Sequence, residues 1–496
     1  MKRVITISLL IGFTLHIAAQ QMLTLDSCRN MALRNNKQIN IAKLKLKVAQ
    51  DTKKAARTKY LPHIDIMGGY EFMSKEISIL NNEQKSMLGN LGSAASGHLG
   101  NTASTIISEM AANGLITPQA AEAFGKILNN SLPGLQQTGN SIGQSISDAF
   151  KTDTKNMFAA SIMLTQPIFM GGKIVAANKI ADLNESLNAD ALNNQMQNIA
   201  FNIDNTYWTV VSLKHKETLA TSYLELVKRL REDVQKMIKE GVATKADGLK
   251  VDVKVNEAEM QLTQVENGLS LSKMLLCQLC GIQISKDIVL ADEANENISS
   301  SEYIYTADAE SAKENRLELR MLNKALEISK QKTNIVRSEY LPQIALTAGY
   351  TVTNPNVYNG FERKFSGVWN VGVLVKMPVW NWFESKYKIR ANKTAASIAQ
   401  LELEEAQEKI ELQVNQGSFK VSEANKRLTM AEKNTEEAEE NLRCANVGFK
   451  EGVMDVTDVM AAQTAWLQAK SQKIDAEIDV KLSQINMKKV LGDFLF

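Results

Sequence analysis

The sequence has little of what most compact enzymes and nucleic-acid-binding proteins contain. Of its 496 residues only 7 are proline, 4 histidine and 4 cysteine, and 57 basic residues nearly balance 55 acidic ones. This balance argues against a nucleic-acid partner, which requires a clustered basic surface. A mean hydropathy of −0.20 argues against a bundle of membrane-spanning helices, each of which needs about 20 mostly apolar residues.

Motifs for catalysis and metal binding are also missing. The sequence has no HExxH, no GxSxG and no P-loop, so we expect no enzyme activity, no cofactor and no metal site. Cys277 and Cys280 are spaced as CxxC but lie in an apolar, helix-like run without a second ligand pair. Core packing explains them better than redox chemistry or half a zinc site.

The N-terminus carries an export signal. Lys2 and Arg3 precede an apolar run at 4–19, which is typical of a secretory signal peptide covering residues 1–20. The alternative, an N-terminal membrane anchor, is disfavoured because the run is short for a span. We therefore expect an exported protein.

The chain contains two copies of one unit. Residues 57–62 recur as 337–342, 280 positions later, whereas the segments at 166–169, 239–242 and 281 recur 211 positions later. The difference of 69 means that the first copy carries about 69 extra residues between these two sets of matches. Matches in one order at constant spacing indicate a tandem repeat.

Residues beside the repeated prolines alternate with a period of two. The pattern predicts strands of about ten residues after Pro62 and Pro342 and before Pro167 and Pro378, a length that suits a tilted membrane-spanning strand. On the apolar face we place these candidate lipid-facing residues: Ile64, Ile66, Tyr70, Ile344, Leu346, Tyr350 and Trp369.

The rest of each copy is predicted to form long helices. Residues 172–240 and 383–451 lack proline and are rich in helix formers, so each could extend roughly 100 Å. Rods of this length bury apolar stripes against neighbours, as coiled coils do. A glycine, Gly241 or Gly452, ends each rod before a returning helix.

These elements predict a domain organisation. After the signal peptide, the first repeat covers 21–281, a linker covers 282–306 and the second repeat covers 307–496. The first repeat runs helix, strand, insertion, strand, long helix and returning helix. The insertion, at about 74–155, is rich in Gly, Ser and Asn, and we expect it to be mostly loop.

Four strands are too few for a membrane barrel. Lipid admits only helices and closed barrels, because every backbone polar group must be paired. Four strands cannot close around a lumen, so several chains must contribute, and three would supply 12 strands.

The chain resembles the TolC-like outer membrane efflux proteins, also called outer membrane factors. The resemblance rests on Tyr60-Leu61-Pro62 with Tyr340-Leu341-Pro342, on Gln166-Pro167-Ile168-Phe169-Met170-Gly171-Gly172, and on Gly241-x-x-Thr244-x-x-Asp247 with Gly452-x-x-Asp455-x-x-Asp458-Val459. It implies a mixed, mainly α fold, with a trimeric barrel of long helices continuous with a 12-stranded transmembrane β-barrel. One departure is Trp382-Phe383, which replaces Gly171-Gly172 and leaves the turn geometry there open.

The resemblance also implies a function. It suggests a homotrimeric duct in the outer membrane of a Gram-negative bacterium, with the helices in the periplasm and the insertion at the outer mouth. Such a duct would work with a periplasmic adaptor and an inner-membrane transporter in tripartite efflux or type I secretion. The chain-reversal points would then be adaptor contacts: Gly241, Val242, Gly452 and Val453.

Two alternatives stay open. In similar proteins acidic side chains ring the entrance; Asp458 matches one such position, Ala461 stands at the second, and Asp247 is the first-copy counterpart of Asp458. The other interpretation is that both aspartates stabilise helix starts. For the whole chain, the alternative is an exported coiled-coil scaffold or adhesion protein without a pore, which would leave the four alternating strands unexplained.

Overall fold

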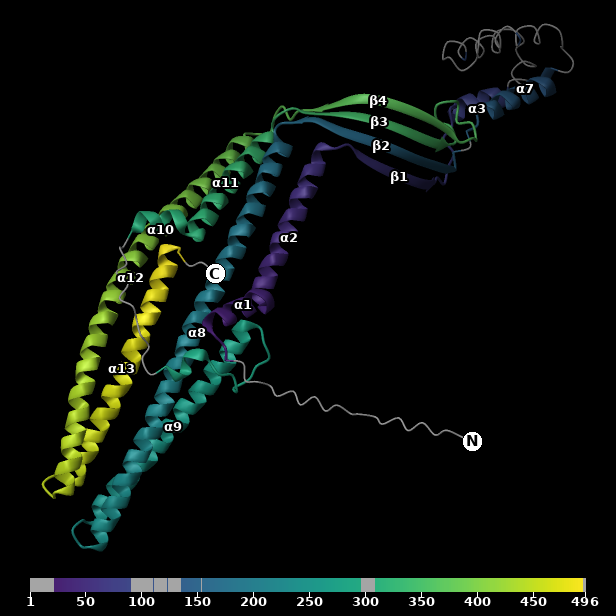
Figure 1. Ribbon diagram of the computed structural model, residues 1–496. Coiled ribbons are helices and arrows are strands. Elements are labelled where there is room, and N and C mark those ends of the chain that lie inside the picture. Colours follow the sequence, from purple (N-terminus) through teal and green to yellow (C-terminus); the bar gives the residue numbers. More distant parts are fainter. Residues whose placement is uncertain are drawn as a thin grey trace, which may run out of the picture. The chain divides into compact units, whose positions relative to one another are not determined.

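The computed structural model describes residues 22–90, 110, 123, 135–152, 154–295 and 308–493. The predicted signal peptide, much of the insertion and the second half of the predicted linker lie outside these residues. The chain divides into two units (Figure 1). One comprises Met1–Arg57, Gly172–Glu339 and Trp380–Phe496, and the other Thr58–Gly171 and Tyr340–Val379.

The first unit is helical. Its elements are α1 (Leu25–Asn35), α2 (Lys37–Arg57), α8 (Lys173–Lys239), α9 (Lys245–Cys280), η2 (Ala291–Ala294), α10 (Ala309–Asn315), α11 (Leu317–Ser338), α12 (Glu384–Lys450) and α13 (Val456–Leu491). In the described part of the chain, no helix is both long and apolar enough to cross a membrane.

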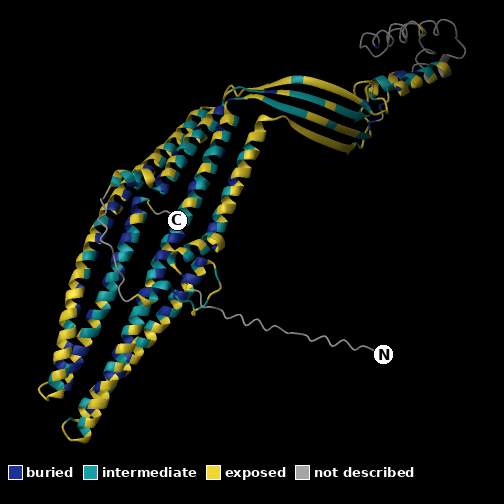
Figure 2. Cartoon of the chain, in the orientation of Figure 1, coloured by how far each residue is buried: buried dark blue, intermediate teal, exposed yellow. Residues whose placement is uncertain are grey.

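The long helices confirm the repeat. α8 and α12 each have 67 residues, and α9 and α13 each have 36. They form two long antiparallel pairs, α8 with α9 and α12 with α13 (Figure 1). Figure 2 shows buried residues along the sides on which the helices meet and exposed residues on the opposite sides. The absence of proline permits this length, and side-by-side packing stabilises it.

The largest apolar core of the helical unit among the described residues gathers α1, α2, α8, α9 and α13. We call it the central cluster, and it consists of Leu23, Cys28, Ala32, Ile39, Ile199, Ile203, Tyr207, Val210, Val211, Leu269, Leu276, Cys280, Leu290 and Ile478. It holds the N-terminal segment and the start of the inter-repeat linker against the long helices. The Tyr207 hydroxyl donates a hydrogen bond of 2.6 Å to Asp292 of η2, and this polar contact satisfies a buried hydroxyl.

The second unit contains the predicted strands. β1 (His63–Phe72), β2 (Asn156–Met170), β3 (Gln343–Asn354) and β4 (Ser366–Lys376) form one antiparallel sheet in that order. A 3₁₀ turn, η1 (Thr58–Tyr60), precedes β1. All residues of β1 are exposed. The two outer strands, β1 and β4, have no partner on their outer edges within the described chain.

β2 is longer than predicted and continues through Pro167. It pairs with β3 at Pro167 and Ala345, and the register then shifts between Pro167 and Phe169. A bulge accommodates proline, which cannot donate a ladder hydrogen bond. The periodicity before Pro167 therefore identified the strand but not its end.

The turn that precedes each long helix is the same in both repeats. Gly171 and Gly172 have φ of +62° and +86°, and Trp382 and Phe383 have φ of +50° and +63°. The left-handed conformation costs a non-glycine residue about 1–2 kcal/mol. In the second repeat aromatic contacts offset this cost, because the Trp380 ring packs at 5.7 Å from the rings of both Trp382 and Phe383.

The insertion contains helices where the sequence suggested loop. α3 (Asn82–Gly89) starts at a capping box formed by Asn81 and Gln84, and α7 (Leu135–Ala149) is amphipathic. Both contribute to a small apolar cluster of Leu80, Leu88 and Met110 packed by Ile146 and Phe150. The Gly, Ser and Asn content concealed these helices, because only a few apolar positions are needed for so small a core.

Candidate functional site

The first tip, which we define as residues 240–247, reverses the chain between α8 and α9. Gly241 has a φ of +80°, a conformation that favours glycine. The amides of Gly241 and Val242 donate to the carbonyls of Ile238 (3.2 Å) and Met237 (2.9 Å). This is a Schellman motif, which satisfies the last carbonyls of the helix. No atom lies within 4 Å of a Cβ placed at Gly241, so backbone conformation alone requires the glycine.

Asp247 belongs to the capping box that starts α9. One of its oxygens accepts hydrogen bonds from the Thr244 amide (3.1 Å) and the Thr244 hydroxyl (2.6 Å), and the other accepts one from Lys250 at 3.2 Å. These contacts, the Thr244 hydroxyl first, hold the pKa of Asp247 below its usual 3.8. The carboxylate is therefore charged at neutral pH, and both of its oxygens already accept hydrogen bonds from residues at the start of its own helix.

The second tip, residues 451–458, repeats this design with one chemical change. Gly452 has a φ of +73°, and the Val453 amide donates to the Gly448 carbonyl at 2.8 Å. The cap of α13 is Asp455, whose carboxylate accepts from the Asp458 amide at 2.9 Å. Two carboxylates thus stand where the first tip has Thr244 and Asp247. Asp458 is exposed, and its one hydrogen bond within the cap, from the Asp455 amide, is long at 3.4 Å.

Both tips rest on one apolar cluster. It combines residues of α8 and α9 with residues of the α13 start: Tyr223, Val227, Leu230, Val234, Val251, Val255, Ala258, Val456, Val459 and Met460. Beyond this cluster the tip valines have no apolar cover, since Val242 is 69% exposed and Val453 is 82% exposed. That these two valines form a contact surface stays a prediction.

Ion pairs that the sequence did not predict tie the helices together near the tips. Arg231 of α8 contacts Asp252 of α9 at 2.6 Å, and Lys228 contacts Glu259 at 3.0 Å. Lys470 of α13 pairs with Glu439 of α12. No local pattern marks such pairs, because their partners face each other only after the helices pack.

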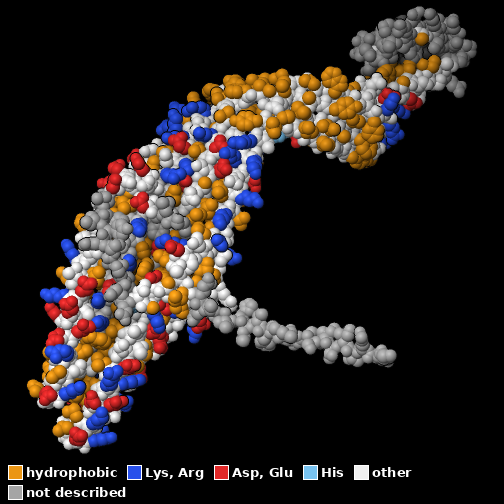
Figure 3. All heavy atoms as spheres, in the orientation of Figure 1, with side chains coloured by type: hydrophobic (Ala, Val, Ile, Leu, Met, Phe, Trp, Pro, Cys, Tyr) orange, Lys and Arg blue, Asp and Glu red, His pale blue; other side chains and the backbone are white. Residues whose placement is uncertain are grey.

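The seven candidate lipid-facing residues lie on one face of the sheet. Tyr350 pairs with Ile162 on β2 and with Trp369 on β4, and Ile162 pairs in turn with Ile66 of β1. Paired residues of antiparallel strands share a face, and Ile64, Tyr70, Ile344 and Leu346 follow from the same register. Hydrophobic side chains gather over the strands, whereas charged ones are spread over the helices (Figure 3). That this face meets lipid stays a prediction.

Nothing in the described residues resembles a metal centre. No group of three or more His, Cys, Asp and Glu side chains there is placed to hold a metal ion. Cys277 and Cys280 are both buried, as expected for core residues.

Comparisons with known proteins place the chain in a family. The model of the outer membrane efflux protein family matches residues 129–281 and 309–493, one segment in each repeat. A search of curated proteins found no match.

Solved structures share the fold. The CmeC outer membrane channel of Campylobacter jejuni is 13% identical, with a TM-score of 0.71 over 94% of this chain and 85% of that one. The outer membrane protein VceC of Vibrio cholerae is 13% identical, with a TM-score of 0.68 over 94% and 96%. The open MtrE outer membrane channel of Neisseria gonorrhoeae is 14% identical, with a TM-score of 0.67 over 94% and 88%.

The family match covers more than half of the chain, and the mainly helical fold with four strands and two repeats agrees with it. The protein therefore belongs to the outer membrane efflux protein family, located in the outer membrane of a Gram-negative bacterium with its helical part in the periplasm.

Proposed function

We propose that the protein is the exit duct of a tripartite efflux or type I secretion system and conducts substrates passively from a periplasmic adaptor and an inner-membrane transporter to the exterior. The observation that carries the proposal is the pair of duplicated helix hairpins with capped, exposed tips in a chain whose four-stranded sheet has two open edges. The duct uses no catalysis and no cofactor. Its repeats are 21–281 and 307–496, joined by 282–306.

Closure of the sheet requires more than one copy. The outer edges of β1 and β4 present unpaired backbone groups, which are too costly to leave in lipid. Pairing β1 of one copy with β4 of the next satisfies both edges. Three copies then make a 12-stranded barrel, which is within the size range of outer-membrane barrels.

The helices carry matching unpaired surfaces. α9 exposes Leu249, Val253, Met260 and Leu271, and α12 exposes Leu401, Leu412, Phe419 and Met430. At about 100° per residue, each set forms a stripe opposite the buried face of its own helix. We infer that α9 of one copy packs on α12 of the next, so the same three-fold arrangement closes the helices and the sheet.

Replacing Phe419 by glutamate should break this packing. Phe419 is 75% exposed in the single chain and would be covered in the trimer, where a lone carboxylate has no partner. We expect the amount of trimer in the detergent extract, measured by native electrophoresis and cross-linking, to fall about tenfold or more. The reason is that burying an unpaired charge costs several kcal/mol.

The matched control is Phe419→Leu, which keeps an apolar side chain and should keep the trimer. A Phe419→Glu protein that cross-links as a trimer as efficiently as the Leu variant would rule out this stripe as an interface.

The tips are proposed as the docking and entrance surface. Val242 and Val453, placed by Gly241 and Gly452, offer apolar contacts to the adaptor, and the carboxylates of Asp247 and Asp458 line the entrance. Because Asp247 is held by its own cap and Asp458 is exposed, we assign entrance selectivity mainly to Asp458 and helix capping mainly to Asp247.

Neutralising these two residues separates the roles. In planar lipid bilayers Asp458→Asn should lower the preference of the channel for cations about twofold to fivefold, because a nearby unit charge attracts a passing ion only weakly through water. Asp247→Asn should change selectivity less and make the first tip more sensitive to protease, because the cap is weakened.

Glu232→Gln is the control, since it removes an exposed carboxylate two turns before the first tip. Equal selectivity in the Asp458→Asn and Glu232→Gln channels would argue that Asp458 only caps its helix.

A further inference from the structure

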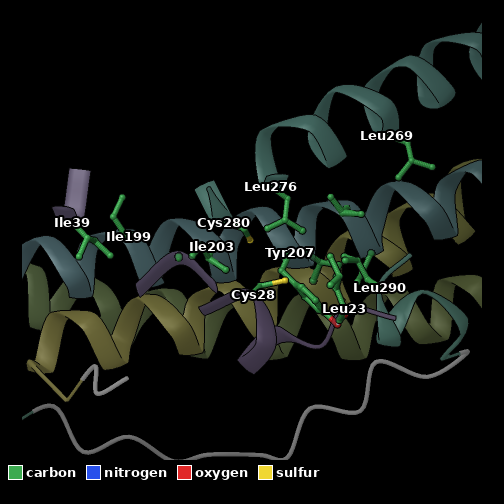
Figure 4. Packing of buried hydrophobic residues seen from close by; sticks show 14 residues of the cluster. Leu23, Cys28, Ile39, Ile199, Ile203, Tyr207, Leu269, Leu276, Cys280 and Leu290 are labelled. Atoms are coloured by element: carbon green, nitrogen blue, oxygen red, sulfur yellow. The ribbon is translucent and has the colours of Figure 1, made fainter. Parts of the chain in front are cut away.

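Two cysteines far apart in sequence meet in the central cluster. Cys28 lies in the first turn of α1, and Cys280 is the last residue of α9. Both side chains are fully buried. Figure 4 shows both residues beside Tyr207, where they belong to the same buried cluster, and a side-chain hydrogen bond with Cys280 lowers the pKa of Cys28.

The surroundings hold both helices in place around this pair. Before α1, Leu23 forms an isolated β-bridge with Leu290 of the linker: its amide donates to Val289 at 2.9 Å and its carbonyl accepts from Ala291 at 3.0 Å. At the far end, the Asn36 side chain donates to the carbonyl of Leu279, next to Cys280, at 2.7 Å. The relative position of the two sulfurs is thus determined by contacts before and after Cys28.

A charged contact adds a third anchor. The Arg29 guanidinium, adjacent to Cys28, donates to the buried Asp204 carboxylate of α8 through two nitrogens, one at 2.8 Å. Arg29 therefore fixes the helix face that carries Cys28 against α8.

The nearer cysteine in sequence is the poorer partner. Cys277 and Cys280 are three residues apart on one helix, where Cβ atoms are about 5–6 Å apart, whereas a disulfide needs about 3.5–4.5 Å. The Cys277 thiol also points elsewhere and donates to the Ser285 carbonyl at 3.5 Å. The CxxC spacing is therefore not the reactive pair.

We propose that Cys28 and Cys280 are joined by a disulfide bond in the exported protein. The helical part lies in the periplasm, an oxidising compartment in which disulfides form and persist. The bond would fasten the N-terminal segment to the junction of α9 and the inter-repeat linker.

The oxidant is a protein disulfide of the thiol–disulfide oxidoreductase class. The Cys28 thiolate attacks one sulfur of that disulfide, forms a mixed disulfide and expels the carrier's second sulfur as a thiolate. The Cys280 thiolate then attacks the Cys28 sulfur, forms the Cys28–Cys280 bond and releases the first carrier sulfur. The two electrons and two protons of the cysteine thiols end on the carrier as a dithiol.

Oxidation must take place while both thiols can still be reached by the carrier. Because both thiols are fully buried in the folded chain, oxidation precedes the packing of α1 on α8. The finished bond is then shielded from reductants.

Counting free thiols tests the proposal. The full chain is taken from outer membranes, denatured in acid without reductant and alkylated, and the added mass is measured together with the linked peptides. Of the four cysteines, only Cys277 and the exposed Cys444 should react. Four reactive thiols in most chains, or a peptide pair that links Cys277 to Cys280, would overturn the proposal.

Two variants distinguish a Cys28–Cys280 bond from a Cys277–Cys280 bond. Removing a cysteine with Cys28→Ser should raise the number of reactive thiols from two to three, because Cys280 loses its partner. Cys277→Ser should lower it from two to one, because only Cys444 then stays free. If the CxxC pair were bonded instead, the two results would be reversed, with one reactive thiol in Cys28→Ser and three in Cys277→Ser.

Discussion

Replacing Arg29 by methionine should lower the free energy of unfolding by about 3 kcal/mol. Asp204 is fully buried, and Arg29 binds it through two nitrogens. Removing the cation leaves a buried carboxylate without its ionic partner, a change that typically costs roughly 3–5 kcal/mol. We expect the lower end of this range because about a quarter of the Arg29 side chain is exposed. The measurement is urea unfolding in detergent, followed by circular dichroism.

The loss should depend on pH in a defined direction. Burial raises the pKa of Asp204 from its usual 3.8, and Arg29 opposes this rise. Without Arg29 the pKa rises further, so the carboxyl takes up a proton at higher pH in the folded protein. A protonated Asp204 needs no cation. The difference between variant and wild type should therefore be full above the pKa of Asp204 in the folded variant. It should disappear as the pH falls to the lower, but still raised, pKa of Asp204 in the folded wild type.

Two further variants control this experiment. Arg34→Met removes an exposed arginine from the same helix and should change stability by no more than about 0.5 kcal/mol. The double variant Arg29→Met with Asp204→Leu should recover most of the loss, because an apolar pair can replace a buried ion pair. Unfolding of Arg29→Met at the same urea concentration as Arg34→Met would show that the ion pair does not stabilise the fold.

Replacing Gly281 by alanine should destabilise the protein by about 2–5 kcal/mol. Gly281 ends α9 with a φ of +70°, where a Cβ costs about 1–2 kcal/mol. That Cβ would also stand 2.7 Å from the carbonyl carbon of Asn35. Backbone cannot move aside as a flexible side chain can, so overpacking adds about 1–3 kcal/mol. The loss is measured by urea unfolding, and hydrogen exchange should show faster exchange at the end of α1.

Gly241→Ala is the matched comparison. Gly241 has a similar φ of +80°, but no atom lies within 4 Å of its added Cβ, so only the conformational cost of about 1–2 kcal/mol is expected. Equal losses at the two glycines would mean that the close approach of α9 to Asn35 does not constrain the chain.

Much of the fold was predictable because its signals are local. A 67-residue helix such as α8 is encoded by residues that favour helix at every turn and by a glycine where it ends. The tips were found for the same reason, since a capping box joins residues only three positions apart, as in Thr244 and Asp247. The strands were found by their period of two. The roles of the tip residues in docking and conduction are still predictions.

Other features had no local signal. The bulge after Pro167 depends on pairing with β3, and the helices of the insertion depend on a small apolar core. The aromatic residues at Trp382 and Phe383 adopt a glycine-like turn that residue type alone argues against. In the first two cases a tertiary contact outweighs the local preference of the chain, and at Trp382 and Phe383 the packing of both rings on Trp380 does so.

By itself the sequence determined the order of the long helices and strands, the duplication and the positions of the chain reversals, because hydrophobic period, helix propensity and capping act within a few residues. Only the tertiary structure decided which distant groups meet: Arg29 with Asp204, Cys28 with Cys280, and Gly281 with Asn35. These contacts join residues separated by 175 or more positions. They depend on how long helices pack side by side, and no short-range pattern in the chain records that arrangement.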